Sequence, residues 1–100
     1  MARTGNDVLR EELRARIGER MLQNALNMDP AEARGLLGEQ LVAKIERHIA
    51  NGGTAIGAAN ECHCNISLDD HPRWAALYKV AAHCLAERED AQTAPSPVPA

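Results

Sequence analysis

The chain has very few aromatic residues: Trp74 and Tyr78 are the only two among 100 residues, and Phe is absent. A hydrophobic core must therefore be built from Leu, Ile, Val, Met and Ala. Strands favour β-branched and aromatic residues, so this composition argues against a sheet. We predict an all-α fold, a compact bundle of four to five helices in one domain.

Basic residues are too few to form a strongly positive surface. Lys and Arg number 11 against 14 Asp and Glu, which gives a net charge of −3. Residues 29–71 alone contribute −4, from three basic and seven acidic side chains. Nucleic-acid binding usually depends on a clustered basic surface that neutralises phosphates. We therefore expect no direct contact with nucleic acid, and a protein partner with a basic surface.

Long apolar runs are missing as well. No stretch approaches the roughly 18 apolar residues that a membrane span needs, and the N-terminus leads into a charged segment rather than an apolar signal sequence. The expectation is a cytoplasmic protein without membrane contact. Its three cysteines are an odd number, which cannot close a disulfide framework, and they are expected as thiols.

The N-terminal quarter carries one apolar stripe. Apolar residues recur there every four positions, at Leu9, Leu13, Ile17 and Met21. This spacing predicts a helix from Asn6 or Asp7 to about Leu26, with residues 1–6 as a flexible N-terminus and residues 7–89 as the helical domain. We expect this helix to pack antiparallel against the next one through a short connection at residues 27–29.

Two boundaries define the second predicted helix. Asp29 can cap it and Pro30 suits its first position, whereas Asn51-Gly52-Gly53 can take the left-handed conformation that ends a helix. Gly35 and Gly38 each disfavour helix, so we expect the element to break or bend near them.

Two further helices and a tail complete the predicted organisation. Thr54 can cap a short helix that runs to Cys62, and a connection at residues 65–71 leads to a last helix that ends near Arg88. Residues 90–100 contain alternating prolines, which favour an extended, disordered tail.

A candidate binding site lies where polar and acidic residues surround the 65–71 connection. Its members are Asn60, Glu61, Asp69, Asp70 and Arg73. These side chains cannot all be buried, and they present negative charge to a partner, although Asp69 and Asp70 can equally serve as helix caps. Residues 54–81 invite comparison with a helix-turn-helix, but the two carboxylates stand where DNA-contacting residues would lie.

Cysteine and histidine residues are the remaining candidates for chemistry. Cys62, Cys64 and His71 offer the atom types of a zinc site, but cysteines two positions apart on a helix point about 200° apart. Ordinary thiols are the favoured interpretation, and no metal or cofactor is expected. A cysteine nucleophile paired with His63, His71 or His83 would need an oxyanion hole and a substrate pocket, for which the sequence has no signal. We expect no enzyme activity.

In size, acidity and helical character, the whole chain resembles small phage-encoded inhibitors, in particular the anti-CRISPR proteins of the type I-F class. The resemblance rests on no motif, so it carries no site residues across. It implies a non-enzymatic inhibitor in the host bacterial cytoplasm, a monomer or weak dimer, that binds a CRISPR RNA-guided surveillance complex and blocks target DNA binding. Two other classes stay open: a helical interaction module such as an adaptor or antitoxin, and a small DNA-binding or packaging phage protein.

Overall fold

The computed structural model describes residues 3–93, which form six continuous helical segments and no strand. The first segment comprises α1 (Gly5–Val8), a π-helical turn η1 (Leu9–Leu13) and α2 (Arg14–Ile17). The others are α3 (Glu19–Asn27), α4 (Pro30–Leu37), α5 (Glu39–Ala50), α6 (Ala55–Cys62) with a 3-10 turn η2 (His63–Asn65), and α7 (His71–Thr93). The all-α prediction is confirmed, with one segment more than expected. Within the described range, no helix has the length and apolarity to cross a membrane.

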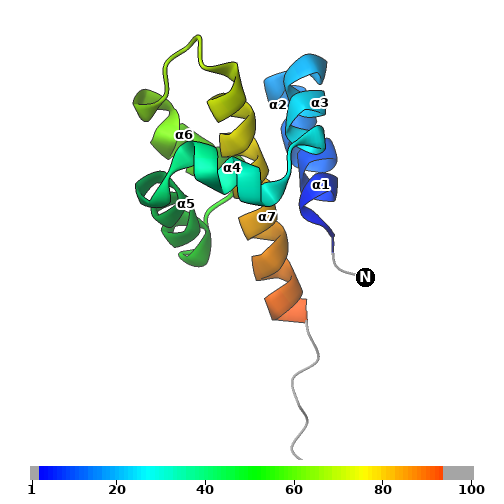
Figure 1. Cartoon of the computed structure of the whole chain (residues 1–100). Helices are drawn as coiled ribbons and strands as arrows, with labels where there is room; N and C mark the ends of the chain where they lie inside the picture. Colours follow the sequence, from blue (N-terminus) through cyan, green and yellow to red (C-terminus); the bar gives the residue numbers. More distant parts are fainter. Residues whose placement is uncertain (1–2, 94–100) are drawn as a thin grey trace, which may run out of the picture.

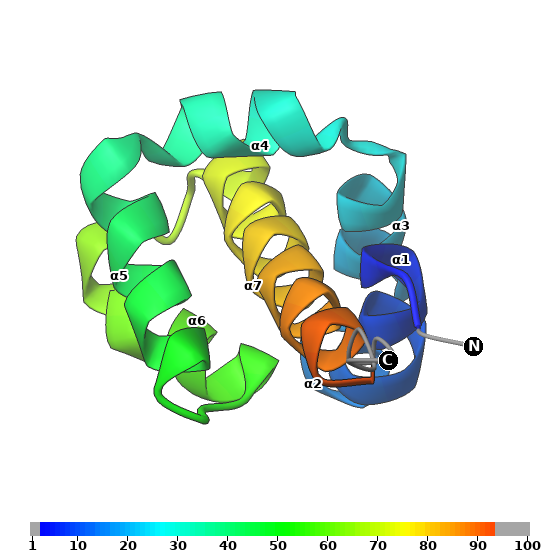
Figure 2. The same cartoon turned by 90° about the horizontal axis from the view of Figure 1, so that it is seen from below.

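The long helix α7 is the centre of the molecule, and the other helices lie around it (Figure 1). Seen from below, α1, α2 and α3 lie on one side of α7, α5 and α6 lie on the other, and α4 crosses between them (Figure 2). The residues of α7 that lie in the core are Ala75, Ala76, Leu77, Val80, Ala81, Ala82, Cys84, Leu85 and Ala86. These residues face several directions around the helix, as expected for a helix that its neighbours enclose. The small alanine side chains of α7 let those neighbours approach closely.

The single N-terminal helix predicted from the apolar stripe is wrong, because Gly18 divides it. Gly18 has a φ of +78°, a left-handed conformation that glycine adopts without strain. The chain therefore turns back after α2, and α3 runs beside it (Figure 1). The first segment also begins earlier than predicted, because Thr4 caps it. The Thr4 hydroxyl accepts a hydrogen bond from the backbone N–H of Asp7, and the backbone N–H of Thr4 donates one to the Asp7 carboxylate. Residues 4–6 thus belong to the capped helix rather than to a flexible N-terminus.

The predicted antiparallel pairing of the first two helices is also wrong. Met28 and Asp29 both have extended backbones, which turn the chain away from α3 before α4 begins. The buried faces of α3 and α4 then both pack on α7. Asp29 does cap α4, accepting a bond from the Ala31 N–H at 2.8 Å. The expected break occurs at Gly38 (φ +86°), whereas Gly35 stays inside α4.

The remaining boundaries agree closely with the sequence. Gly52 takes a positive φ at the end of α5, and the Thr54 hydroxyl caps α6 by accepting from the Gly57 N–H at 3.0 Å. At its other end α7 continues to Thr93, beyond the predicted end at Arg88, so residues 90–93 are helical. The predicted disorder of residues 94–100 lies outside the described residues.

Three cations of α7 bind the C-terminal ends of three other helices. The bonds run from Arg73 Nε to the carbonyl oxygen of Leu36 in α4 (3.0 Å), from Lys79 Nζ to that of Leu26 in α3 (3.3 Å), and from Arg88 Nη1 to that of Ile49 in α5 (2.8 Å). The last carbonyls of a helix have no partner within the helix and carry the negative end of its dipole. Each cation therefore fixes one surrounding helix to α7.

Lys79 is the most deeply buried of these cations, with 2% of its surface exposed. Its ammonium group also donates to Asn6 Oδ1 at 2.6 Å, which ties α1 to the same point. Burial lowers the pKa of Lys79; the nearby carboxylate of Asp29 opposes this effect, and the charge of Arg10 adds to it. The lysine thus joins α1, α3 and α7 through one buried group.

Replacing Lys79 with methionine keeps much of the apolar stem but leaves the Leu26 carbonyl and Asn6 amide oxygens without their donor. We expect the free energy of unfolding to fall by about 1–3 kcal/mol, the usual cost of unsatisfied buried acceptors. Urea unfolding followed by circular dichroism measures this. Lys44→Met, at an exposed lysine, is the matched control and should change stability by less than about 0.5 kcal/mol. Equal effects of the two substitutions would contradict the assigned role.

We expect His83 to make the fold sensitive to acid. Its ring packs against Gly5, and its Nε2 atom is buried without a hydrogen-bond partner. Burial lowers the pKa of His83 below its ordinary 6.5; Lys79 and Arg34 lower it further, and Glu87 opposes them. As the pH falls below about 6.5, the unfolded chain binds a proton that the folded chain resists, so stability decreases.

His83→Leu should therefore flatten the loss of stability below about pH 6.5, because the residue no longer titrates. Urea midpoints measured between about pH 7.5 and pH 5 give this slope. His71→Leu, at an exposed histidine, should keep the slope of the unmodified protein. A slope that persists in His83→Leu would show that another group causes the acid sensitivity.

Candidate protein-docking site

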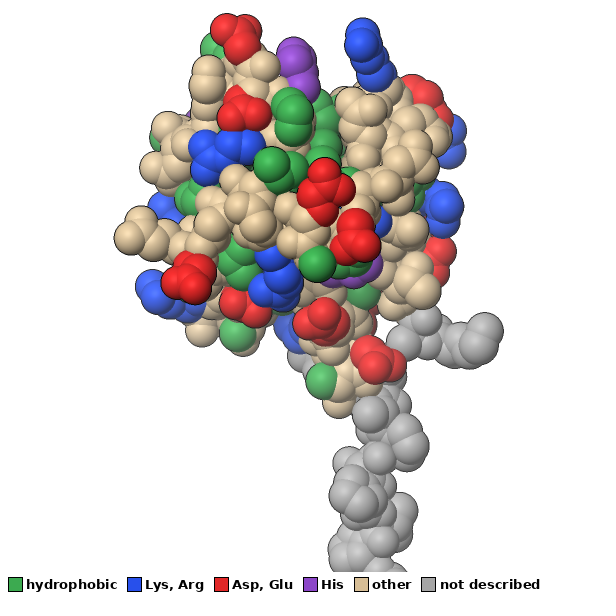
Figure 3. Space-filling model, in the orientation of Figure 1, with side chains coloured by type: hydrophobic (Ala, Val, Ile, Leu, Met, Phe, Trp, Pro, Cys, Tyr) green, Lys and Arg blue, Asp and Glu red, His purple; other side chains and the backbone are tan. Residues whose placement is uncertain are grey.

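An apolar groove separates α3 from the first turns of α7. It consists of two adjoining hollows of about 470 and 350 Å³ that share Asn24 and His71. The apolar side chains that line it are Ile17, Met21, Met28, Pro72 and Ala75. Figure 3 shows hydrophobic side chains in the hollow between the start of α7 and the α2–α3 turn.

The groove exists because only one side of α3 reaches the core. Leu22 and Ala25 are buried against α7, whereas Met21 is half-buried and Asn24 is exposed. Met28 is half-buried as well, at the bend between α3 and α4. Methionine side chains are flexible and polarizable, so they adapt to the shape of an incoming group. This part of the surface is therefore suited to receive an apolar side chain.

Leu68 is the most exposed large apolar residue in the described part of the chain, with 84% of its surface accessible. It lies in the loop before α7, three residues ahead of His71, which lines the groove. A single exposed leucine is common on proteins, and this one lines neither hollow of the groove. Sequence reasoning missed Leu68 because the residue was read only as part of a connection.

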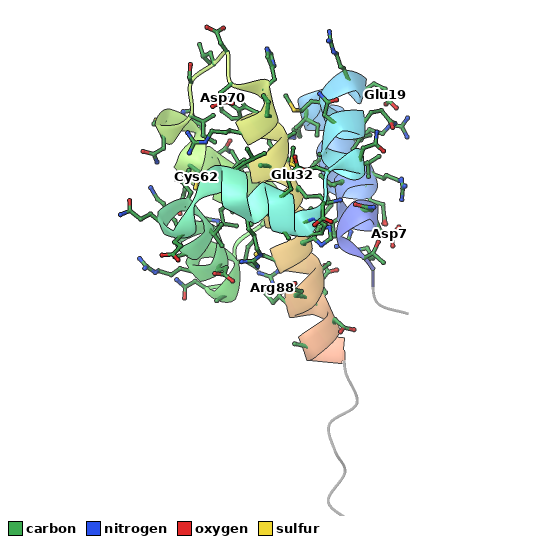
Figure 4. The ribbon with its side chains drawn as sticks, in the orientation of Figure 1. Asp7, Glu19, Glu32, Cys62, Asp70 and Arg88 are labelled. Atoms are coloured by element: carbon green, nitrogen blue, oxygen red, sulfur yellow. The ribbon has the colours of Figure 1, made fainter. Side chains whose placement is uncertain are left out.

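Two of the five predicted binding residues are used by the fold. Asp70, in the loop before α7 (Figure 4), accepts a hydrogen bond from the backbone N–H of Arg73 at 3.3 Å and so caps α7. The Arg73 guanidinium binds the carbonyl oxygens of Leu36 and Leu37 at the end of α4. Both side chains therefore already make contacts that hold the fold together.

The other three predicted residues, Asn60, Glu61 and Asp69, are exposed, but they differ in their contacts. Glu61 pairs with His48, whose Nδ1 lies 3.2 Å from Glu61 Oε1. The backbone oxygen of Asn60 accepts a bond from His63 Nδ1 at 2.5 Å. Asp69 has no side-chain hydrogen bond or ion pair with any residue between 3 and 93. Among the predicted acidic residues, Asp69 is thus the one whose charge stays available.

The structure does not bring the candidate zinc ligands together. Cys62 is buried in α6 behind α4 (Figure 4), and Cys64 and His71 are exposed. Within residues 3–93, no three His, Cys, Asp or Glu side chains are grouped as a metal site requires. The zinc alternative at Cys62, Cys64 and His71 is therefore wrong. Cys64 Sγ instead lies 3.5 Å from Nε2 of the neighbouring His63, on the surface.

Comparisons with protein-family models, with curated proteins and with solved structures find no match to this chain. The exposed Leu68–Asp69 loop is therefore the feature from which a function is proposed.

The three cysteines should differ sharply in reactivity. Burial raises the pKa of Cys62, and it raises the pKa of Cys84 to about 11, so both remain protonated and shielded at neutral pH. We expect iodoacetamide at pH 7 to label Cys64 alone, giving one adduct per folded chain by intact mass spectrometry. Cys64→Ser should show none, and the chain unfolded in guanidinium should show three. Equal labelling of all three thiols in the folded protein would contradict the assigned burial.

Proposed function

We propose that the protein is a non-enzymatic inhibitor that binds a basic surface of a CRISPR RNA-guided surveillance complex and blocks target DNA binding. The observation that supports this proposal is the tip of the loop before α7. There, Leu68 is 84% exposed beside Asp69, whose carboxylate has no partner within the described residues. The loop thus presents an apolar anchor and a free negative charge side by side.

This combination suits a surface that normally holds nucleic acid. Such surfaces carry Lys and Arg to neutralise phosphates, so they attract an acidic loop and favour its approach. Binding energy at protein interfaces is concentrated in a few buried anchors, with charged groups at the rim giving specificity. In this proposal Leu68 is the anchor and Asp69 the rim charge, and the exposed Asn60 and Glu61 extend the contact.

The overall charge of the chain supports the same choice of partner. The net charge is −3, and residues 29–71, the segment that contains the loop, contribute −4 to it. An inhibitor of this kind needs no catalytic group, because occupying the surface is enough to exclude DNA. Its effect depends on affinity and on the position of the bound protein.

The loop can be tested with purified type I-F surveillance complex and a DNA gel-shift assay. Leu68→Ser and Asp69→Lys should each require about tenfold more protein to displace target DNA, because a buried leucine or a charge contact contributes about 1.4 kcal/mol. Glu39→Lys, at an exposed carboxylate on α5, is the control for charge reversal and should inhibit like the unmodified protein. Circular dichroism establishes that each variant is folded.

Two outcomes would count against the proposal. If the unmodified protein neither binds the complex nor displaces DNA, the proposed partner is wrong. If it inhibits but both loop variants inhibit equally well, the partner stands and the loop is not the contact surface.

A further inference from the structure

We infer that His83 is an acid-sensitive switch for the first turn of α1. While its ring is neutral, the side chain packs beneath Gly5 and holds that turn on α7. When its ring is protonated, the side chain turns toward Glu87 and the turn loosens. The proposed partner plays no part in this switch, which lies in a different part of the chain from the Leu68–Asp69 loop.

The first turn of α1 is held on α7 at three points. These are the bond from Lys79 Nζ to Asn6 Oδ1 (2.6 Å), the contact of the His83 ring with Gly5, and the bond from Arg3 Nε to Glu89 Oε1 (2.9 Å). The histidine contact lies between the other two along the chain. Thr4 and Gly5 can therefore move while Arg3 and Asn6 stay attached.

The neutral ring of His83 fits its place, and a protonated ring does not. Gly5 is buried, and a methyl group on its Cα would overlap the ring, so the ring lies directly against the backbone. Nε2 is buried without a hydrogen-bond partner, whereas Nδ1 is not enclosed. A neutral ring can therefore carry its proton on Nδ1, where water accepts it. Protonation adds an N–H group at Nε2, where the described residues offer no acceptor.

A hollow beside the ring gives the protonated side chain another position. The hollow has a volume of about 360 Å³, and Glu87 lines it together with Gly5 and His83. Glu87 is exposed and makes no hydrogen bond or ion pair with any residue between 3 and 93. It follows His83 by four residues, the spacing at which opposite charges on a helix attract each other. A protonated ring that turns toward Glu87 leaves the space beneath Gly5 unfilled.

The charged groups around His83 oppose a positive ring in its place beneath Gly5. Lys79 precedes it on α7, and Arg34 approaches from α4, where it also pairs with Glu46 at 3.5 Å. Burial lowers the pKa of His83, the cations of Lys79 and Arg34 lower it further, and Glu87 opposes them. The remaining charges that line the hollow are Arg3 and Asp90. Arg3 is already bound to Glu12 and Glu89.

His83 responds in a pH range where the other attachments hold. A side chain that has turned into water has the ordinary histidine pKa of about 6.5, so below this pH protonation favours the loosened state by up to about tenfold per pH unit. Hydrogen bonds with Thr4 hold the pKa of Asp7 below its ordinary 3.8, and the bond with Arg3 holds that of Glu89 below 4.5. The cap and the Arg3 contact therefore stay charged down to about pH 5.

Hydrogen exchange of the full chain, followed by NMR, tests the switch. The amides of Asp7 and Val8 report on the turn, because both donate to Thr4, at 3.2 and 3.1 Å. We expect their protection factors to fall about tenfold between about pH 7.5 and pH 5. The nuclear Overhauser effect between the His83 ring and Gly5 should weaken over the same range. The amide of Val42 is the internal control, because it makes the equivalent bond to Gly38 at 3.1 Å in the first turn of α5, and it should change less than about twofold.

Three variants separate the parts of the switch. His83→Gln does not titrate, so the protection of Asp7 and Val8 should no longer depend on pH, whereas His71→Gln, at an exposed histidine, should respond like the unmodified protein. Glu87→Gln removes the attracting carboxylate and should make the fall in protection about twofold smaller. Gly5→Ala displaces the ring at every pH, so the turn should be as loose at about pH 7.5 as it is in the unmodified protein at about pH 5.

Any of three results would overturn this switch: protection of Asp7 and Val8 that does not change with pH, an equal change in His83→Gln, or an equal change at Val42. An unaltered response in Glu87→Gln would refute the turn toward Glu87. Circular dichroism identifies a variant that does not fold, and in that case the exchange and Overhauser data of the unmodified chain decide the outcome.

Discussion

The structure depends on a central helix that is both apolar and cationic. Its alanines allow five other helical segments to pack closely around α7, and its cations bind carbonyl groups at the ends of three of them. The two properties work together, because close packing buries helix ends whose last carbonyls then need donors. Lys79 illustrates this best, since its buried ammonium group reaches both α3 and α1. A short chain with a small aliphatic core thereby obtains a defined arrangement of helices.

Local signals in the sequence were sufficient to predict most helix boundaries. The cap at Asp29, the stop at Gly52 and the cap at Thr54 were predicted because each depends on a few neighbouring residues. Gly18 was missed because the apolar stripe continues across it, and a four-residue spacing does not reveal a turn in the middle. The central position of α7 was missed for a related reason: its alanines give it little amphipathic pattern, and its cations look like ordinary surface charges until their acceptors are known.

The candidate site shows the same limit. Sequence reasoning directed attention to the loop before α7, but it could not separate the charges that the fold uses from those that stay available. Asp70 and Arg73 are used in capping, whereas Asp69 remains free, and this difference depends on contacts with α4 and with the backbone of α7. The groove was unpredictable from spacing, because its walls come from α2, α3 and α7 and exist only once Gly18 has folded the N-terminal segment back.

Hydrogen exchange of the native protein, followed residue by residue with NMR, tests the central role of α7 most directly. If the other helices all depend on it, the amides of residues 75–86 exchange most slowly, at the rate set by global unfolding. The amides of the last turns of α3, α4 and α5 should then be protected as well, because cations of α7 hold those ends. Faster exchange in α7 than in α5 or α6, through local opening, would contradict this account.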